Sequence, residues 1–152
     1  MTGVQTCALP ICSALPTAPI GKGVVIRVGD RSRIFSPAVT QWIVSTAINF
    51  QKQDKTFQYQ RKLMDAGTCE ASIFTLFGYS AGALCIPLGN YHNRDFQKGI
   101  IASEFISAND YLDMVKLFLA LVMKGCTEVQ LYQQKTPKYK KRTGELGELF
   151  FE

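Results

Sequence analysis

The sequence predicts an α/β fold in which a mixed sheet is flanked by helices. Two runs rich in β-branched or apolar residues, 23–28 and 83–88, are typical of buried strands, and segments with helical spacing alternate with them. Such alternation favours layered packing around one core. With 152 residues and 47% hydrophobic content, the chain has enough apolar material for a single domain.

The first predicted elements are a strand and a long helix. Residues 23–28 form the strand, and a Gly-Asp pair marks a tight turn before residues 31–35, so a hairpin or two short strands are expected. A Ser-Pro pair then supplies an N-cap and a proline at the first helical position. We expect an amphipathic helix over residues 37–52, with an apolar face formed by Val39, Trp42, Ile43, Thr46, Ala47 and Phe50.

The middle of the chain predicts a strand, a short helix and a second buried strand. Residues 56–63 alternate apolar and polar side chains, which is the period of a half-buried strand. Thr68 can cap a short helix that ends at Gly78 and carries three large apolar residues, Ile73, Phe74 and Phe77. Residues 83–88 form a continuous apolar run, which suits a strand buried on both faces.

A last helix is predicted ahead of the C-terminal segment. It begins with a capping-box variant formed by Ser107 and Asp110, and a glycine at position 125 closes it. Its apolar residues recur at helical spacing, at Tyr111, Val115, Phe118 and Val122. Beyond about residue 127 the sequence turns polar and lysine-rich, so we expect a frayed or disordered tail.

Composition argues against two classes of partner. The formal net charge is +5, but five basic residues gather within residues 135–142 and no aromatic-interleaved motif accompanies them, so no nucleic-acid partner is expected. No run approaches the roughly 18 to 20 apolar residues of a membrane span, so no membrane partner is expected. Five cysteines without Cys-x-x-Cys spacing indicate reduced thiols and a cytoplasmic location.

The predicted organisation is a leader over residues 1–19, a domain over residues 20–126 and a polar basic tail over residues 127–152. Residues 2–11 have neither helical nor strand periodicity and resemble the in-frame translation of a common sequencing adapter. We therefore expect residues 1–11 to be artefactual and the chain to be the C-terminal fragment of a longer protein. A genuine disordered leader is the alternative.

Two residues are first candidates for a functional site. His92, the only histidine, follows the apolar run 83–88 where a strand would open into a loop, and ligands bind at the C-terminal ends of strands in open α/β sheets. Glu70 lies in the first turn of the predicted short helix, where the helix dipole stabilises negative charge. We treat His92 as a candidate metal ligand and Glu70 as a candidate substrate-binding residue. The structural alternatives are a surface histidine and a good helix start.

Several short motifs, taken in order, resemble the C-terminal part of the dinuclear-zinc exopeptidases, and above all the tetrahedral and glutamyl aminopeptidases. The two main motifs are Gly-Thr-Cys-Glu-Ala at residues 67–71 and Ile-Pro-Leu-Gly-Asn-Tyr-His at residues 86–92. A Gly-Lys-Gly loop at residues 21–23 and a Ser-Pro helix start accompany them. The resemblance covers roughly residues 20–124 and implies that the chain is the C-terminal part of a zinc-exopeptidase catalytic domain.

The resemblance also implies roles for particular residues. His92 would be a ligand of one of two zinc ions, or other divalent metals, in the parent enzyme. Glu104 resembles a glutamate that follows the family's histidine, here after a longer loop, and is a candidate substrate-binding residue; a solvent-exposed strand residue is the alternative. Two metals would bind a bridging water and polarise the scissile carbonyl. The other ligands and the general base would lie before residue 20, so no catalytic residue is assigned here.

We therefore expect a fragment of a cytosolic zinc-dependent aminopeptidase that acts on short peptides and whose parent is a homo-oligomer. The isolated chain should be inactive, because one histidine cannot hold two zinc ions. A related zinc carboxypeptidase or deacylase is the first alternative. The second is a non-catalytic α/β binding module in which His92 is structural and the basic tail recruits an acidic partner.

Overall fold

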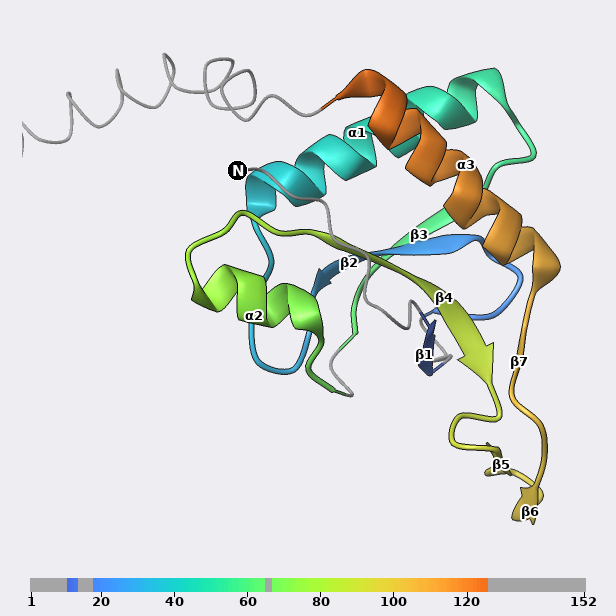
Figure 1. The fold of residues 1–152 in the computed structure, drawn as a ribbon. Helices are drawn as coiled ribbons and strands as arrows, with labels where there is room; N and C mark the ends of the chain where they lie inside the picture. Colours follow the sequence, from blue (N-terminus) through green and yellow to red (C-terminus); the bar gives the residue numbers. More distant parts are fainter. Residues whose placement is uncertain (1–10, 14–17, 65–66, 126–152) are drawn as a thin grey trace, which may run out of the picture.

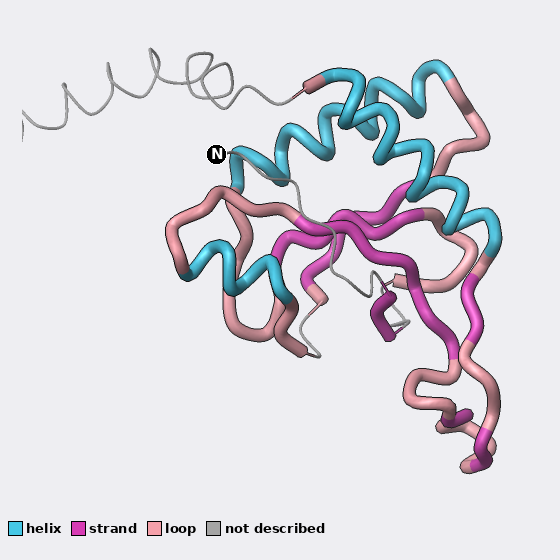
Figure 2. Tube along the Cα trace, in the orientation of Figure 1, coloured by secondary structure: helices cyan, strands magenta, loops and turns pink. Residues whose placement is uncertain are grey.

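The computed structural model describes residues 11–13, 18–64 and 67–125. Two long helices lie side by side on one face of a sheet, a short helix lies near its other face, and a narrow arm projects from one end (Figure 1). Figure 2 shows the same layers by element type. The elements are, in order, β1 (Ile11–Ser13), β2 (Val24–Gly29), α1 (Pro37–Gln53), β3 (Tyr59–Leu63), α2 (Glu70–Leu76), β4 (Ala83–Gly89), β5 (Arg94–Asp95), β6 (Ile100–Ile101), β7 (Phe105–Ile106) and α3 (Ala108–Lys124).

The sheet of the described residues is mixed and is built around β4. This strand pairs in parallel with β1 and antiparallel with β2 and β7, and β2 pairs in parallel with β3, which gives the order β1-β4-β2-β3. Because β2 and β4 run in opposite directions, β4 ends where β2 and β3 begin. The mixed sheet flanked by helices confirms the predicted fold class.

The two faces of the sheet are packed differently. On one face, side chains from β2 and β4 pack against both long helices in the main core, whose members include Val24, Ile26, Leu84, Ile86, Val39, Ile43, Leu117 and Leu121. On the other face, Val25 and Cys85 pack with Ala18 and Met64. All six residues of the predicted strand 83–88 are buried, because both faces of β4 are covered.

The helix predicted over residues 37–52 forms as α1. The Ser36 hydroxyl accepts a hydrogen bond from the backbone N–H of Val39 (3.4 Å), and Pro37 occupies the first turn. The hairpin expected before this helix forms only its turn, with an isolated bridge between Gly29 and Ile34. Side-chain hydrogen bonding explains the difference, because the Asp30 carboxylate accepts the N–H groups of the turn and no second strand extends from it.

The N-terminus of α2 differs from the prediction. The N-cap is Cys69 rather than Thr68, and it makes no side-chain capping bond. Instead, the backbone N–H of Cys69 donates to the carboxylate of Asp30 (2.8 Å), which lies 39 residues earlier in the chain. The helix stops before Gly78, whose φ is +84°, as predicted. The three apolar side chains that the sequence placed here, Ile73, Phe74 and Phe77, are all exposed, and so is Leu76.

The buried face of α3 also differs from the predicted one. Ser107 caps the helix as expected by accepting from the backbone N–H of Asp110 (3.4 Å). The predicted stripe is wrong, however, because Tyr111 and Val122 are exposed and the buried stripe is Asp110, Asp113, Met114, Leu117 and Leu121. The helix is apolar around most of its circumference, so spacing alone defines more than one stripe.

One of the predicted domain boundaries can be compared with the structure. Residues 11–13, which lie within the predicted leader, form β1 and pair with β4. Of the predicted artefactual residues 1–11, the structure describes only Ile11, which lies in β1. The rest of that segment and the predicted tail over residues 127–152 lie outside the described residues. Among the described helices, none is both long and apolar enough to span a bilayer.

Candidate functional site

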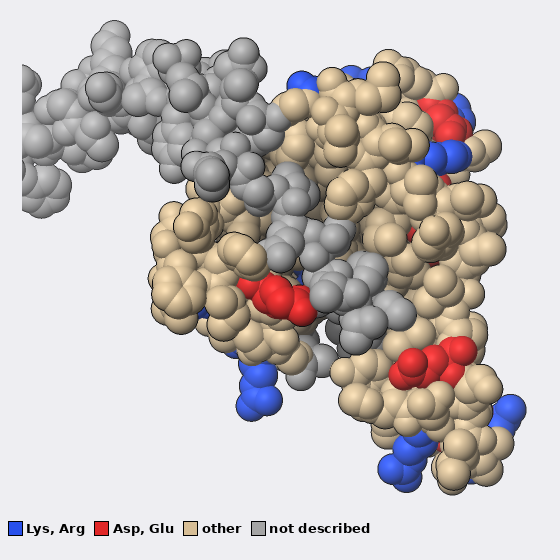
Figure 3. Space-filling view, in the orientation of Figure 1, with Lys and Arg blue, Asp and Glu red and all other residues tan. Residues whose placement is uncertain are grey.

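An arm formed by residues 88–106 carries the candidate metal ligand. It continues the antiparallel pairing of β4 with β7, passes through the loop of residues 90–93, and ends in the small β5–β6 sheet. The arm projects beyond the body of the molecule (Figure 1). Both acidic and basic side chains gather on it (Figure 3). The end of β4 therefore opens into an exposed loop, as the sequence predicted for His92.

His92 is exposed and adopts an unusual backbone conformation. Its φ is +60°, in the left-handed region that non-glycine residues seldom adopt, and Asn90 and Asn93 also have positive φ values of 52° and 55°. The imidazole lies against the ring of Tyr91, with 4.0 Å between the ring centroids. The imidazole is thus held at the surface of the arm by a tightly turned backbone.

The structure brings Glu104 to the same place. Its Oε1 accepts a hydrogen bond from the backbone N–H of His92 at 2.8 Å. Twelve residues separate the pair in sequence, and the β5–β6 turn between them folds back to bring them together. Two of the three candidate residues from the sequence are therefore direct neighbours.

Glu70 lies elsewhere. It is exposed in the first turn of α2, next to Cys69, whose backbone N–H is bonded to Asp30 directly after β2. This position is the end of the sheet where β2 and β3 finish and β4 begins. His92 follows the opposite end of β4, so the structure does not bring Glu70 and His92 together.

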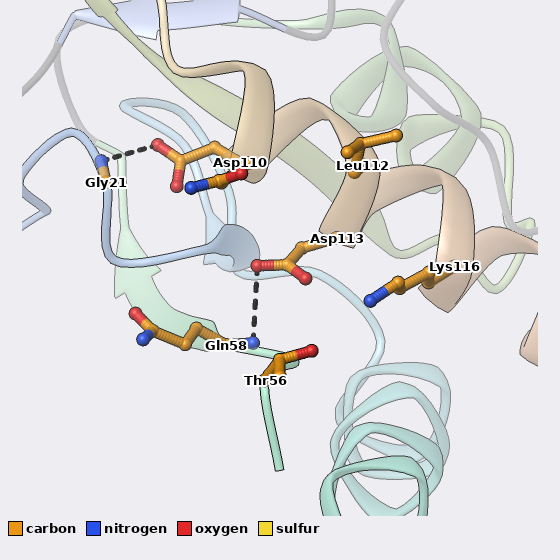
Figure 4. A pocket seen from close by; sticks show the side chains of 8 residues that line it. Gly21, Thr56, Gln58, Asp110, Leu112, Asp113 and Lys116 are labelled. Atoms are coloured by element: carbon orange, nitrogen blue, oxygen red, sulfur yellow. Dashed lines mark hydrogen bonds between the residues drawn. The ribbon is translucent and has the colours of Figure 1, made fainter. Parts of the chain in front are cut away.

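A polar pocket of about 180 Å³ lies at the same end of the sheet as the arm. Asp110 lines it, and one of its oxygens accepts the backbone N–H of Gly21 at 2.7 Å (Figure 4). Its other oxygen accepts the backbone N–H of Gly23 at 2.8 Å. Both glycines have positive φ, and a Cβ on Gly23 would overlap the backbone of Gln58. The remaining lining residues are Thr56, Asn109, Leu112, Asp113 and Lys116.

Two further charged residues define the electrostatics of this pocket. Burial raises the pKa of Asp113, although the backbone N–H of Gln58 donates to its carboxylate at 3.2 Å. Lys116 instead donates to Asp54 at 2.8 Å, and this contact holds the pKa of Asp54 well below its usual range. The long-range roles of Asp110 and Asp113 were missed from sequence, where Asp110 was assigned to the helix cap. The Gly-x-Gly loop at residues 21–23, whose backbone N–H groups require acceptors, was the available signal.

The described residues fit one position of a metal site. The exposed imidazole of His92 is a nitrogen donor of the kind that zinc prefers. The described ranges contain no group of three or more His, Cys, Asp and Glu side chains that could hold an ion together. Oε1 of Glu104 is already bonded to a backbone N–H. These residues alone therefore do not make up the dinuclear site that the resemblance implies.

Comparison with solved structures identifies the class of fold. Aminopeptidase APDkam598 from the archaeon Desulfurococcus kamchatkensis is similar with a TM-score of 0.59 and 24% identity, over 84% of this chain and 35% of that chain. The dodecameric PhTET1-12s gives 0.54 and 25%, over 78% and 32%. The Pyrococcus horikoshii TET1 peptidase gives 0.53 and 24%, over 77% and 31%. The chain has the fold of TET aminopeptidases and spans about a third of the length of these structures.

The family follows from the sequence. Residues 6–117 match the family model described as M42 glutamyl aminopeptidase. The match covers most of the chain, so the chain belongs to this family, and the resemblance to the glutamyl and tetrahedral aminopeptidases is confirmed. Among curated proteins, none matches the sequence.

Proposed function

We propose that this chain supplies the histidine-bearing part of a metal-dependent aminopeptidase that removes residues from the N-terminus of short peptides. The observation that carries the proposal is the position of His92 in a chain of the M42 family: its imidazole is exposed on the arm directly after the buried strand β4. An aminopeptidase is favoured over a carboxypeptidase or deacylase because the matching family is one of aminopeptidases.

His92 is the metal ligand in this proposal, and zinc is the proposed metal. When bound, two such ions would supply a bridging water and polarise the scissile carbonyl. The contribution of this chain is to hold one imidazole at a defined place on the arm. Glu70, at the other end of the sheet, remains a substrate-binding prediction, and no catalytic acid or base is assigned to this chain. The purified chain by itself should release no amino acid from peptides, with or without added Zn²⁺.

Assembly and location belong to the same proposal. We infer that the parent enzyme is a cytoplasmic homo-oligomer, and two observations support the oligomeric part of this inference. The solved TET1 structures are described as a dodecamer and as tetrahedral or octahedral shells. In addition, large apolar side chains such as Phe77, Ile101 and Met123 are more than two-thirds exposed, as expected of surfaces that other parts of an assembly cover.

A chimera tests the proposed activity. The segment of the D. kamchatkensis aminopeptidase that this chain matches would be replaced by residues 20–124, and hydrolysis of aminoacyl and N-acylated substrates would be compared with Zn²⁺ or Co²⁺ present. We expect cleavage of aminoacyl substrates only. His92→Gln should lower kcat/KM by more than about 100-fold, because even outer-shell partners of a metal contribute about 10- to 100-fold.

Two controls keep this experiment interpretable. Lys98→Gln changes an exposed residue on the same arm and should leave kcat/KM within about twofold, as expected for a surface substitution. Size-exclusion chromatography establishes that each chimera assembles like its scaffold. An assembled chimera that keeps full activity with His92→Gln would contradict the proposed ligand. Cleavage of N-acylated substrates alone would favour the deacylase, and no hydrolysis by an assembled chimera would favour the binding module.

A further inference from the structure

We propose that Glu104 is a positioning residue, whose carboxylate sets the left-handed backbone of His92 and thereby the direction of its imidazole. The conformational part of this inference stands on the arm alone. The part that makes the imidazole a metal ligand rests on the proposed function. Glu104 therefore acts through His92 and not as a ligand or substrate contact of its own.

The outgoing and returning segments of the arm are hydrogen-bonded to each other both before and after His92. On one side, Leu88 and Gly89 pair with β7. On the other, the backbone N–H of Ala102 donates to the carbonyl of Asn93 at 3.0 Å, before the β5–β6 pairs begin. Between these points the regular ladder is interrupted. In this interval, hydrogen bonds that involve side chains connect the two segments instead.

Two side-chain hydrogen bonds span the interruption. The Asn90 amide donates to the carbonyl of Ser103 at 2.8 Å. The backbone N–H of His92 donates to Oε1 of Glu104 at 2.8 Å. Each of the three left-handed residues of the loop, at 90, 92 and 93, is thus hydrogen-bonded to a residue of the segment 102–104.

The left-handed conformation of His92 explains why its backbone needs support from the side chain of Glu104. Asparagine tolerates positive φ comparatively well, whereas a bulkier residue keeps it only where the surroundings determine it. The carboxylate of Glu104 meets the His92 N–H with a charge-assisted hydrogen bond, which is stronger than a neutral one. The direction of the Cα–Cβ bond of a residue follows from its backbone conformation. A hydrogen bond that holds the backbone of His92 therefore also sets the direction in which its side chain leaves the backbone.

Nuclear magnetic resonance of the isotope-labelled chain tests the proposal directly. His92 is the only histidine and Trp42 the only tryptophan, so their signals are unique reporters of the loop and of the core. In the unsubstituted chain we expect left-handed backbone shifts at His92, slow exchange of its amide, and a scalar coupling across the hydrogen bond to the Glu104 carboxyl carbon. Glu104→Ala should abolish the left-handed shifts and accelerate amide exchange about tenfold or more.

Two further variants separate positioning from general loss of structure. Glu104→Gln retains a side-chain oxygen that can accept, so it should restore the left-handed shifts of His92. Ser103→Ala removes a side chain but keeps the carbonyl that Asn90 uses, so it should change neither reporter. Trp42 should be unaffected in all three variants. Left-handed His92 shifts and slow exchange in Glu104→Ala would overturn the proposal, and so would a Glu104→Gln chain as disturbed as Glu104→Ala.

These readouts do not depend on peptidase activity. An inactive chimera with intact Glu104 dependence of the His92 backbone would contradict the proposed function and leave the positioning role standing. An active chimera whose His92 conformation ignores Glu104 would do the reverse.

Discussion

The two ends of β4 are held in opposite ways. At the end where β4 begins, Asp30 is 4% exposed, and its carboxylate accepts from Arg33, Cys69, the Ser32 backbone and the hydroxyls of Ser32 and Ser72. At the end where β4 finishes, the exposed Glu104 accepts from the backbone of His92. The carboxylate of Asp30 joins the end of β2 to α2 through buried hydrogen bonds, whereas that of Glu104 holds a loop that is exposed to solvent.

The charge on Asp30 reflects this difference. Burial opposes ionisation of Asp30, but hydrogen bonds from the Ser72 hydroxyl, the Cys69 backbone and Ser32 outweigh it and hold the pKa of Asp30 well below its usual range. A buried, fully bonded carboxylate of this kind stabilises the fold. Acidic residues near the two ends of one strand thus have different roles: Asp30 stabilises the packed body, whereas Glu104 holds an exposed loop.

The largest effect is expected at the buried junction. Asp30→Ala leaves the N–H of Cys69 and the hydroxyl of Ser72 without their buried acceptor, and it should lower the free energy of unfolding by about 3 kcal/mol. Urea unfolding monitored by the fluorescence of Trp42 measures this loss. The same aspartate-to-alanine change at Asp95, on the arm, is the matched control.

Asp95 also accepts two backbone N–H groups, from Gln97 and Lys98, and pairs with the Lys98 ammonium at 3.7 Å. These contacts lie at the surface, so Asp95→Ala should cost at most about 1 kcal/mol. Equal losses at the two positions would break the comparison between the junction and the arm.

The next effect is expected at Asp110, which fastens α3 to the glycine loop before β2. Asp110→Asn replaces one of two accepting oxygens by an amide that cannot accept, so either Gly21 or Gly23 loses its partner. We expect a loss of about 2 kcal/mol in the same unfolding measurement. An unchanged midpoint would show that this end of the sheet does not depend on the contact.

The corresponding change at Asp113, three residues further along α3, should increase stability rather than decrease it. Burial raises the pKa of Asp113 in the folded chain, so the folded state retains a proton at pH values where the unfolded chain, with a pKa of about 3.9, has lost it. The contribution of Asp113 to stability therefore falls as pH rises through this window. Asp113→Asn keeps an acceptor for Gln58 without a charge. It should therefore raise the unfolding temperature above that of the unsubstituted chain at pH 7, and by less at pH 4. A lower unfolding temperature than the unsubstituted chain at pH 7 would contradict this.

The smallest effect is expected at the tip of the arm. Ile101 is 90% exposed, so Ile101→Ser removes almost no buried apolar surface. The free energy of unfolding should change by no more than about 0.5 kcal/mol. A loss above 1 kcal/mol in urea unfolding would mean that Ile101 packs against the body of the molecule and would contradict its 90% exposure.

The site was partly accessible from sequence. The apolar run before His92 predicted a loop position at a strand end, and this was confirmed because β4 ends at Gly89 and the chain then leaves the core. Its left-handed backbone and its contact with Glu104 were not predictable, since they depend on how residues 94–101 fold back. Glu70 was placed correctly on its helix, but the direction of β4 separates it from His92.

Local patterns in the sequence determined the main helices and the central buried strand, but not the short strands β1, β5, β6 and β7. Ser36 and Pro37 start α1, the glycine at 78 ends α2, and the apolar run 83–88 is the buried strand, because capping, backbone freedom and burial act within a few residues. Only the tertiary structure decided which stripe of α3 is buried, that Asp30 rather than Thr68 supports α2, and that Glu104 meets His92. Each of these depends on groups far apart in the chain, whose meeting is set by the order and direction of the strands.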